Sequence, residues 1–330
     1  MTVAATIYDV AARAGVSIST VSLALNRPDR VSAATRERVL HIVEELGFVP
    51  KETAVARARR GVGRIGVLAP FTSYATYGRR LHGVMDALRD SGLDIVVYDH
   101  ESAAQSFSPL LSSLPLSRHL DGLIVMGLPL GPEATARLQT AALPAVLVDT
   151  DPGGFDAVNI DDDSAGFLVG QYLLEKGHRR VAFVHEPQHS TAFVSQGQRR
   201  LAGLRRAFDA ANRPDAVTEI VVGNNVEGGR RAASEVMASG CTAAFAHHDL
   251  LAAGLLSQLR ADRVDVPGEV AIIGFDDGDV AMSLGLSTVR QPFEESGRVA
   301  GRLLLEARAG RPRSRQQIVL AVDIVTRETS

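Results

Sequence analysis

Apolar residues in the first part of the chain recur with the spacing of short helices. The first predicted helix carries them at Ile7, Val10, Ala11 and Ala14. Gly15 can take the left-handed conformation that ends a helix, and Ser17 is a favoured N-cap for a second helix with Val21 and Leu25 on one side. A third helix, opened by Ser32 or Thr35, carries Val39, Ile42, Val43 and Leu46. Three short helices with a tight turn between the first two predict a helix-turn-helix unit.

The second predicted helix has a side that its apolar seam does not use. Ile18, Ser19, Ser22 and Leu23 lie outside the seam formed by its buried positions. A helix that buries one side and presents small, hydroxylated or apolar side chains on the other suits the DNA major groove, which is wide enough to admit it.

From Arg64 onward, apolar strands alternate with helices. Strands are predicted at Ile65–Ala69, Leu93–Tyr98, Gly122–Met126, Ala145–Val148, Val181–His185, Thr218–Val222, Ala243–Ala246 and Val270–Phe275. Helices are predicted at Tyr77–Ser91, Pro132–Ala142, Asp163–Lys176, Gly197–Asn212, Val226–Ser239 and Leu250–Arg260. The final segments, Ser287–Arg290, Phe293–Arg308 and Gln317–Arg327, are expected to cross back between the two series of strands. This alternation predicts two doubly wound parallel sheets, whose ligands bind at the carboxyl ends of the strands and in the cleft between the sheets.

Length and cysteine content narrow the class of protein. The chain has 330 residues, too many for one ordinary core, and a single cysteine, Cys241. No apolar run approaches the roughly 20 residues needed to span a membrane, and the N-terminus lacks the basic start and long apolar region of a secretory signal. We therefore expect a cytoplasmic protein without membrane association or intrachain disulfides.

Charge is divided unevenly along the chain. The net charge of -3 alone argues against a nucleic-acid binder, but residues 1–64 hold ten Lys and Arg against six Asp and Glu, a net +4, which leaves -7 for the rest. A basic front end on an acidic body predicts a polyanionic partner for the front end only.

Five short segments near the N-terminus carry a recognisable pattern. They are Thr6-Ile7-Tyr8-Asp9-Val10-Ala11, Gly15-Val16-Ser17, Thr20-Val21-Ser22, Leu25-Asn26 and Val31-Ser32. Together they resemble the headpiece of the LacI/GalR (lactose-repressor-type) family of bacterial transcriptional regulators. The resemblance implies an N-terminal all-α helix-turn-helix headpiece and an α/β core of two doubly wound subdomains with the periplasmic-binding-protein-like fold. It implies a homodimeric repressor that reads near-palindromic operator DNA and responds to a small-molecule effector, which we expect to be a sugar or sugar derivative.

This resemblance sets the domain boundaries that we predict. The headpiece takes residues 1–49, a hinge helix and linker take 50–63, and the effector-binding and dimerisation core takes 64–330. Subdomain 1 of the core comprises about 64–160 and 291–320, and subdomain 2 about 161–290 and 321–330. No heptad repeat follows the last predicted strand, so we expect a dimer rather than a tetramer.

The hinge departs from the family pattern. In the family, a hinge-helix leucine wedges between base pairs in the minor groove, a known device for kinking DNA. Depending on the register of the alignment, the matching residue here is Arg57 or Arg59. We therefore predict electrostatic contact with the minor groove and less kinking.

The resemblance and the helix pattern together assign DNA contacts. Ile18, Ser19 and Leu23 are expected to face bases. The other expected contacts lie on or beside the first two helices and chiefly bind phosphates: Thr6, Tyr8, Ser17, Thr20, Ser22 and Asn26. No Arg, Gln or Asn is among the base-facing residues, so we expect readout to depend on thymine methyl groups, DNA shape and operator symmetry.

Residues after strand ends are the candidate effector ligands. Phe71, Tyr74 and Tyr77 combine rings with nearby hydroxyls and suit a sugar, although loop packing explains them equally well. Asp149 ends a strand in a carboxylate. By their match to the family, Arg200 and Asp276 are expected to bind vicinal hydroxyls rather than to form a surface ion pair. His248 stands where the family often has asparagine, and a ligand role and a structural role remain equally open for it.

Other chemistries are not supported. Gly61-Val62-Gly63-Arg64-Ile65-Gly66 has the spacing of a dinucleotide fingerprint, but a strand follows it instead of preceding it. The triplet Asp161-Asp162-Asp163 lacks the glycine and spacing of a calcium loop, and helix capping is the better interpretation. We find no catalytic pair, metal site or cofactor motif and expect no enzyme. A solute-binding protein for sugar uptake and a sugar enzyme are the rival interpretations.

Overall fold

The computed structural model describes residues 5–46, 48, 63–100, 120–151, 153–188, 194–310 and 312–330. Arg57 and Arg59, with the rest of the predicted hinge before Gly63, lie outside the described residues. The described part contains no helix that is long and apolar enough to cross a membrane.

The headpiece forms the predicted three helices, α1 (Ile7–Ala14), α2 (Ile18–Asn26) and α3 (Ala33–Leu46), with a 3-10 turn, η1, at Pro28–Arg30. Thr6 and Asp9 form a reciprocal capping box at the start of α1, and Gly15 ends α1 with φ 64°. The Ser17 hydroxyl accepts a hydrogen bond from the Thr20 amide at 3.1 Å and caps α2 as predicted. The buried headpiece core consists of Val10, Ala11, Ala14, Val21, Ala24, Leu25, Val39, Leu40, Ile42, Val43 and Phe48.

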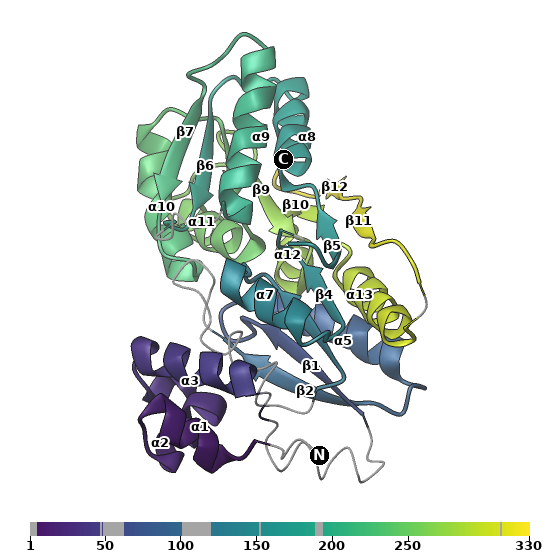
Figure 1. Ribbon diagram of the computed structural model, residues 1–330. Helices are drawn as coiled ribbons and strands as arrows, with labels where there is room; N and C mark the ends of the chain where they lie inside the picture. The colour runs from purple at the N-terminus through teal and green to yellow at the C-terminus, as the bar shows by residue number, and fades with distance from the viewer. Residues whose placement is uncertain are drawn as a thin grey trace. The chain divides into compact units, whose positions relative to one another are not determined.

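The chain divides into two compact units, and the headpiece is grouped with the first. Unit 1 comprises Met1–Val158 with Glu294–Ile318, and unit 2 comprises Asn159–Phe293 with Val319–Ser330, so the chain passes between the units three times. Figure 1 shows the helices and strands of both. Each unit is built on one six-stranded sheet.

The sheet of unit 1 has the strand order β11-β5-β4-β3-β1-β2. Its strands are β1 (Arg64–Ala69), β2 (Asp94–Asp99), β3 (Gly122–Met126), β4 (Ala145–Val148), β5 (Asp156–Ile160) and β11 (Gln317–Leu320). Its helices are α5 (Thr76–Leu88), α7 (Pro132–Thr140) and α13 (Phe293–Arg308). Strands β1 to β5 pair in parallel, and the buried β3 and β4 read as unbroken apolar runs, as expected for strands covered on both faces.

The sheet of unit 2 has the strand order β12-β10-β9-β8-β6-β7, in which β12 is antiparallel to β10. Its strands are β6 (Val181–His185), β7 (Val217–Val221), β8 (Ala243–Ala246), β9 (Ala271–Asp276), β10 (Ser287–Arg290) and β12 (Asp323–Val325). Its helices are α8 (Asp162–Glu175), α9 (Gln196–Ala210), α10 (Val226–Ala238), α11 (Asp249–Ala261) and α12 (Asp279–Leu284). Side chains from alternate strand positions fill a separate core on each face of this sheet.

Three features differ from the sequence prediction. Strand β5 and helix α12 were not predicted, and Gln317–Arg327, expected as one segment, forms β11 in one sheet and β12 in the other. Strand β5 is short and carries polar residues at Asp156 and Asn159, which masks its apolar character. The split of the last segment follows from the passage between units at Ile318 and Val319.

Glycines let pairs of helices approach closely in both units. In unit 1, a Cβ on Gly297 of α13 would lie 1.9 Å from the backbone oxygen of Arg80 on α5. In unit 2, a Cβ on Gly166 of α8 would lie 2.0 Å from the backbone oxygen of Arg200 on α9. Only glycine fits such contacts. The close approach of the two helices fixes the position of the arginine backbone, from which the side chain extends.

Candidate functional site

Helix α2 presents the surface that the sequence predicts for DNA. Ile18 and Leu23 are 40% and 37% exposed, although apolar residues on the opposite side of the helix are fully buried. Ser17 and Ser19 are exposed beside them, whereas Thr20 and Ser22 are half-buried. Tyr8 and Thr6 are exposed at α1, and the side chain of Asn26 lies outside what the structure describes. The arrangement matches a helix prepared to enter a groove.

Ser17 has a structural role in addition to its expected contact with phosphate. Its hydroxyl lies 2.7 Å from that of Ser19 and 2.9 Å from that of Thr20, and it caps the helix. The N-terminal end of α2 therefore carries a small cluster of hydroxyls at the positive end of the helix dipole, which favours an anionic partner such as a phosphate.

A first polar cluster lies in unit 1 and joins Tyr77 and Arg80 of α5 to Asp149, which follows β4. Arg80 is buried and forms an ion pair with Asp149, whose side chain is 9% exposed. The Arg80 guanidinium carbon lies 5.1 Å from the centre of the Tyr77 ring, and Tyr74 packs edge-on against Tyr77 at 6.1 Å. The structure thus brings together three of the four predicted residues of this unit. Phe71 lies half-buried in the turn after β1.

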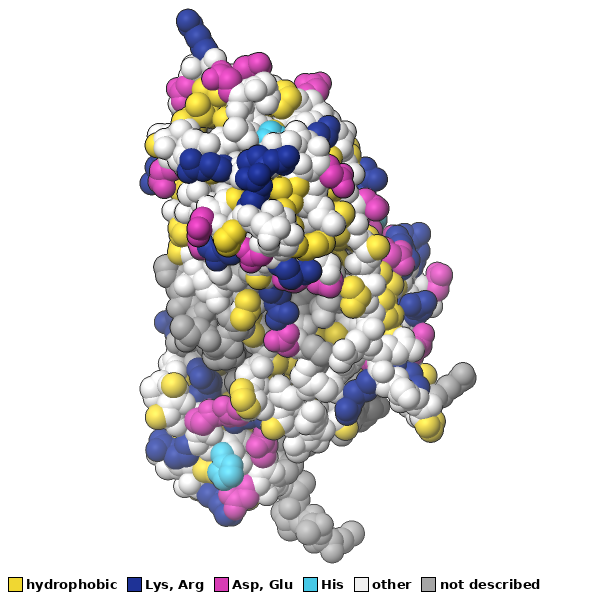
Figure 2. Space-filling view, turned by 90° about the horizontal axis from the view of Figure 1, so that it is seen from above, with side chains coloured by type: hydrophobic (Ala, Val, Ile, Leu, Met, Phe, Trp, Pro, Cys, Tyr) yellow, Lys and Arg dark blue, Asp and Glu magenta, His cyan; other side chains and the backbone are white. Residues whose placement is uncertain are grey.

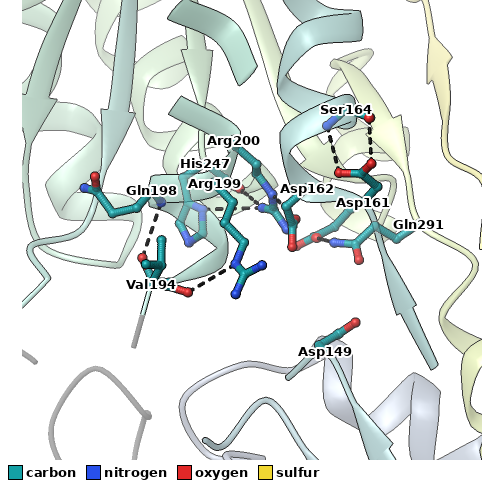
Figure 3. A network of polar contacts seen from close by, with 12 residues as sticks. Asp149, Asp161, Asp162, Ser164, Val194, Gln198, Arg199, Arg200, His247 and Gln291 are labelled. Atoms are coloured by element: carbon teal, nitrogen blue, oxygen red, sulfur yellow. Dashed lines mark hydrogen bonds and ion pairs between the residues drawn. The ribbon is translucent and has the colours of Figure 1, made fainter. Parts of the chain in front are cut away.

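A second polar cluster lies in unit 2 and is centred on Arg200 of α9. Its Nε donates to Oδ1 of Asp162 at 2.8 Å, and its Nη1 donates to the backbone oxygen of His247 at 2.6 Å. The guanidinium stacks on the ring of Phe275 at 3.5 Å. Figure 3 shows Arg200 reaching between Asp162 and His247. Nη2 makes no hydrogen bond to the described residues, which leaves its N–H groups for a ligand.

Asp276 ends β9 in the same unit. Its Oδ1 accepts a hydrogen bond from Nε2 of Gln291 at 2.6 Å. Asp276 has φ 125° and Asp149 has φ 53°, values that residues other than glycine adopt rarely. Strained backbone of this kind concentrates at ligand sites, which supports both aspartates as candidates.

His248 is engaged by protein groups on both ring nitrogens. Nδ1 accepts from the Leu251 amide at 3.3 Å and caps α11, and Nε2 contacts the side-chain oxygen of Asn224. Burial lowers the pKa of His248 well below 6.5, so the imidazole is neutral at pH 7. These contacts give His248 a structural role, and its titration lies below the near-neutral range expected from the sequence.

The loop that follows Asp276 is fixed by buried charges. Burial alone would raise the pKa of Asp277, but hydrogen bonds from Arg290 at 2.7 Å and Arg327 at 2.6 Å outweigh it and lower the pKa. Asp249 accepts from the Thr288 hydroxyl at 2.6 Å and the Gly278 amide at 2.9 Å. Burial raises the pKa of Asp249 to about 6.

Sequence reasoning missed Arg80, Asp162 and Gln291. Arg80 lies three residues after Tyr77 and four before Val84, on the buried side of α5, and this spacing was the available signal. The helix-capping interpretation of the aspartate triplet is correct for Asp161, which caps α8, but the next residue is the buried partner of Arg200. Asp162 lies 38 residues from Arg200, and Gln291 lies 15 residues from Asp276. Contacts over such separations leave no local pattern in the sequence.

The two arginines of these clusters are paired with carboxylates, and the described residues form no metal site. Within the described residues, no group of three or more His, Cys, Asp or Glu side chains could hold a metal ion. On the molecular face in Figure 2, basic and acidic side chains are interspersed with hydrophobic ones. The clusters therefore offer paired hydrogen-bond donors, acceptors and ring faces, which is the chemistry that binds neutral polyhydroxylated ligands.

A helix-turn-helix headpiece joined to two similarly wound sheets defines a DNA-binding transcriptional regulator. Residues 6–51 match the bacterial regulatory proteins of the lacI family, and residues 171–330 match the periplasmic binding protein-like domain. The chain belongs to the LacI family.

Relatives match over nearly the whole chain. It is 31% identical over 338 residues to the HTH-type transcriptional regulator CelR of Thermobifida fusca, with 98% of each chain covered. It is 30% identical over 314 residues to the HTH-type transcriptional repressor CytR of Escherichia coli (strain K12), covering 93% of this chain and 91% of that protein. The structure of a transcriptional regulator CelR–cellobiose complex matches with a TM-score of 0.69 and 29% identity, covering 99% of this chain and 100% of that chain.

These matches separate the rival interpretations. The relatives are transcriptional regulators, so the chain is grouped with regulators and not with enzymes. A solute-binding protein would match through the core alone, whereas these relatives also match through the headpiece.

Proposed function

We propose that this protein is a homodimeric transcriptional repressor whose affinity for a near-palindromic operator is controlled by a carbohydrate effector. The observation that carries the proposal is the pair of buried arginine clusters at Arg80 and Arg200, each beside an aromatic ring and a strand-end loop. The similar CelR structure holds cellobiose, and CytR is named a repressor, which supports this choice.

The effector would be bound by side chains of both clusters. Nη2 of Arg200 and the carboxylate of Asp276 supply a donor and an acceptor for vicinal hydroxyls, and the Tyr74 and Tyr77 rings supply faces for the C–H side of a sugar. Differential affinity of the sugar for two arrangements of the core would then shift the population that binds the operator.

Operator binding is tested first. DNA sites would be selected from fragments of the genome that encodes the protein, and binding would be measured by fluorescence anisotropy at several salt concentrations. We expect salt-sensitive, site-specific binding by a dimer. Absence of any site-specific binding, or a mass of four subunits by sedimentation, would overturn the corresponding part of the proposal.

The orientation of α2 is tested with Leu23→Ala. We expect altered base preference at one base pair in each half-site, because Leu23 is among the exposed residues of α2. Met237→Ala on α10 is the control, since Met237 is similarly exposed, at 40%, but lies outside the headpiece. An unchanged base preference for Leu23→Ala would show that another side of the helix faces the bases.

Effector control is tested by adding a panel of pentoses, hexoses and disaccharides to the operator complex. We expect one sugar to change operator affinity and Arg200→Lys to weaken that response at least about tenfold, because lysine cannot keep the forked hydrogen bonds. Arg206→Lys is the matched control: Arg206 lies on the same helix and pairs with Asp163, but it is 51% exposed. Equal loss in both variants would contradict the assignment of Arg200.

A further inference from the structure

A cavity that is separate from both arginine clusters lies within unit 1. Its volume is about 310 Å³, and it is lined by α7, β4, the loop before β5, α13 and the segment before β11. It adjoins Ala145 and Asp156, the first residues of β4 and β5. Asp149 follows the last residue of β4, so the cavity and the first polar cluster lie at opposite ends of that strand. The volume is sufficient for a small ligand.

Two hydrogen-bond donors converge on the backbone at Gly154 in this cavity. A Cβ on Gly154, which has φ 89°, would lie 3.3 Å from Nε2 of Gln139 and 3.9 Å from Nη1 of Arg315. Neither side chain forms a hydrogen bond or ion pair with the described residues. Both side chains are exposed, and together their N–H groups offer two donors that an anion in the cavity could accept from.

The carboxylate in the wall of the cavity does not cancel the charge of Arg315. Asp156 is buried and paired with Arg313, whose Nη1 donates to its Oδ1 at 3.0 Å. The Gln316 amide also donates to Asp156, at 2.7 Å. The Arg313–Asp156 pair is therefore neutral, and Arg315 leaves the cavity with a single net positive charge.

The remainder of the lining is largely apolar. Leu138 is fully buried, Leu143, Pro144 and Phe155 are half-buried, and Ala307 of α13 completes the wall. A hydrated phosphate dianion would find only one cation there, a poor exchange for its water. A monoanion with a hydrocarbon body matches both the single charge and the apolar wall.

We propose that this cavity binds a small monocarboxylic acid with an apolar ring or chain. Its carboxylate accepts hydrogen bonds from Arg315 and Gln139 beside Gly154, and its hydrocarbon body packs on Leu143 and Phe155. The site involves neither the headpiece nor the two arginine clusters, so it is independent of the function proposed above.

Isothermal titration of the full-length protein with benzoate tests the site. Benzyl alcohol, which has similar size and no charge, is the comparison ligand. We expect benzoate to bind at least about tenfold more tightly than benzyl alcohol, because a charge-assisted pair with Arg315 adds to burial of the ring. Equal affinities, or no heat of binding with benzoate at millimolar concentration, would overturn the proposal.

Variants locate the binding. Arg315→Gln should weaken benzoate binding at least about tenfold, because it retains length and loses the charge. Arg302→Gln is the matched control, since Arg302 is an exposed arginine of α13 that does not line the cavity. Ala307→Phe fills the cavity, leaves Arg315 in place and should also abolish binding. Loss with Arg302→Gln equal to that with Arg315→Gln, or full binding by Ala307→Phe, would contradict the site.

Discussion

The two sheets have one strand order when β1 to β5 and β11 are matched with β6 to β10 and β12. Each unit places a buried arginine on the helix after its first strand, beside a glycine of a neighbouring helix. The charges are connected differently. In unit 1, Arg80 pairs with the aspartate after β4, whereas in unit 2 the matching strand-end aspartate, Asp276, is bonded by neutral Gln291 and Arg200 pairs with Asp162 of α8.

This difference shows which features the repeated backbone requires and which are free to differ between the units. A repeated backbone needs glycine contacts and apolar strands in both units, but it does not dictate which carboxylate neutralises each arginine. In unit 1 the strand-end carboxylate, Asp149, forms the ion pair with Arg80. Unit 2 neutralises its arginine from another helix, and its strand-end carboxylate, Asp276, accepts a hydrogen bond from the neutral Gln291 side chain.

Removing either arginine should produce the largest effect. Arg80→Met and Arg200→Met should each lower the free energy of unfolding by about 3–5 kcal/mol, because each leaves a buried carboxylate without its cation. Arg200→Met should lie at the upper end, since its guanidinium stacks on Phe275 at 3.5 Å, closer than the 5.1 Å between Arg80 and the Tyr77 ring. Urea unfolding measures both, with Arg206→Met as the exposed control, expected within about 1 kcal/mol of the wild type. A small effect in only one unit would show that the two clusters are not equivalent in energy.

The sequence predicted the repeated scaffold better than these connections. Strands β3, β4, β6 and β8 begin and end at the predicted residues, because each is a short apolar run with clear flanks. The strand-end aspartates were found for the same reason. The pairing of Asp162 with Arg200 could not be predicted, because it depends on the close packing of α8 against α9. Gly166 permits that packing, but the sequence does not show which helix Gly166 contacts. The separate half of the predicted DNA surface, at Arg57 and Arg59, stays a prediction.

The second effect depends on pH and concerns unit 2. The pKa of Asp249 is raised from 3.8 to about 6, so between these values the folded protein holds a proton that the unfolded chain has released. Stability from this group is therefore complete below about pH 4 and lost as pH rises through about 6, by roughly 3 kcal/mol at most.

Denaturant unfolding at about pH 4 and about pH 7 compares the wild type with Asp249→Asn, which should lack this loss of stability. Asp279→Asn, an exposed residue of α12, is the control and should retain the wild-type dependence. An identical pH dependence in all three proteins would show that Asp249 stays ionised in the folded state.

The glycine contacts should have intermediate effects that are alike in both units. Gly166→Ala and Gly297→Ala should each cost about 1–3 kcal/mol, because the added methyl must push a helix backbone away. Gly78→Ala on α5, where an added Cβ meets nothing within 4 Å, should instead stabilise by about 0.4–1 kcal/mol. Thermal unfolding measures the stability of the three variants. Clearly different costs for Gly166→Ala and Gly297→Ala would show that the helix contacts of the two units are not equivalent.

The smallest effect should come from the neutral partner in unit 2. Gln291→Ala should cost about 1 kcal/mol, because Asp276 is half-exposed and water can replace the lost donor. Gln258→Ala, which removes a 3.0 Å bond to the exposed Asp262, should cost still less. A cost for Gln291→Ala as large as that for Arg80→Met would mean that the two strand-end aspartates are held alike.

The three passages between units also constrain how the protein is made. Strand β12 and the buried Thr329, whose hydroxyl donates to the Ile272 backbone oxygen at 2.8 Å, belong to unit 2 but follow α13 and β11 of unit 1 in the chain. During translation, the long central part of unit 2 leaves the ribosome with one sheet edge incomplete. It must wait for the last helix and strand of unit 1 before β12 can add to β10, so unit 1 has all of its strands before unit 2 receives its last one.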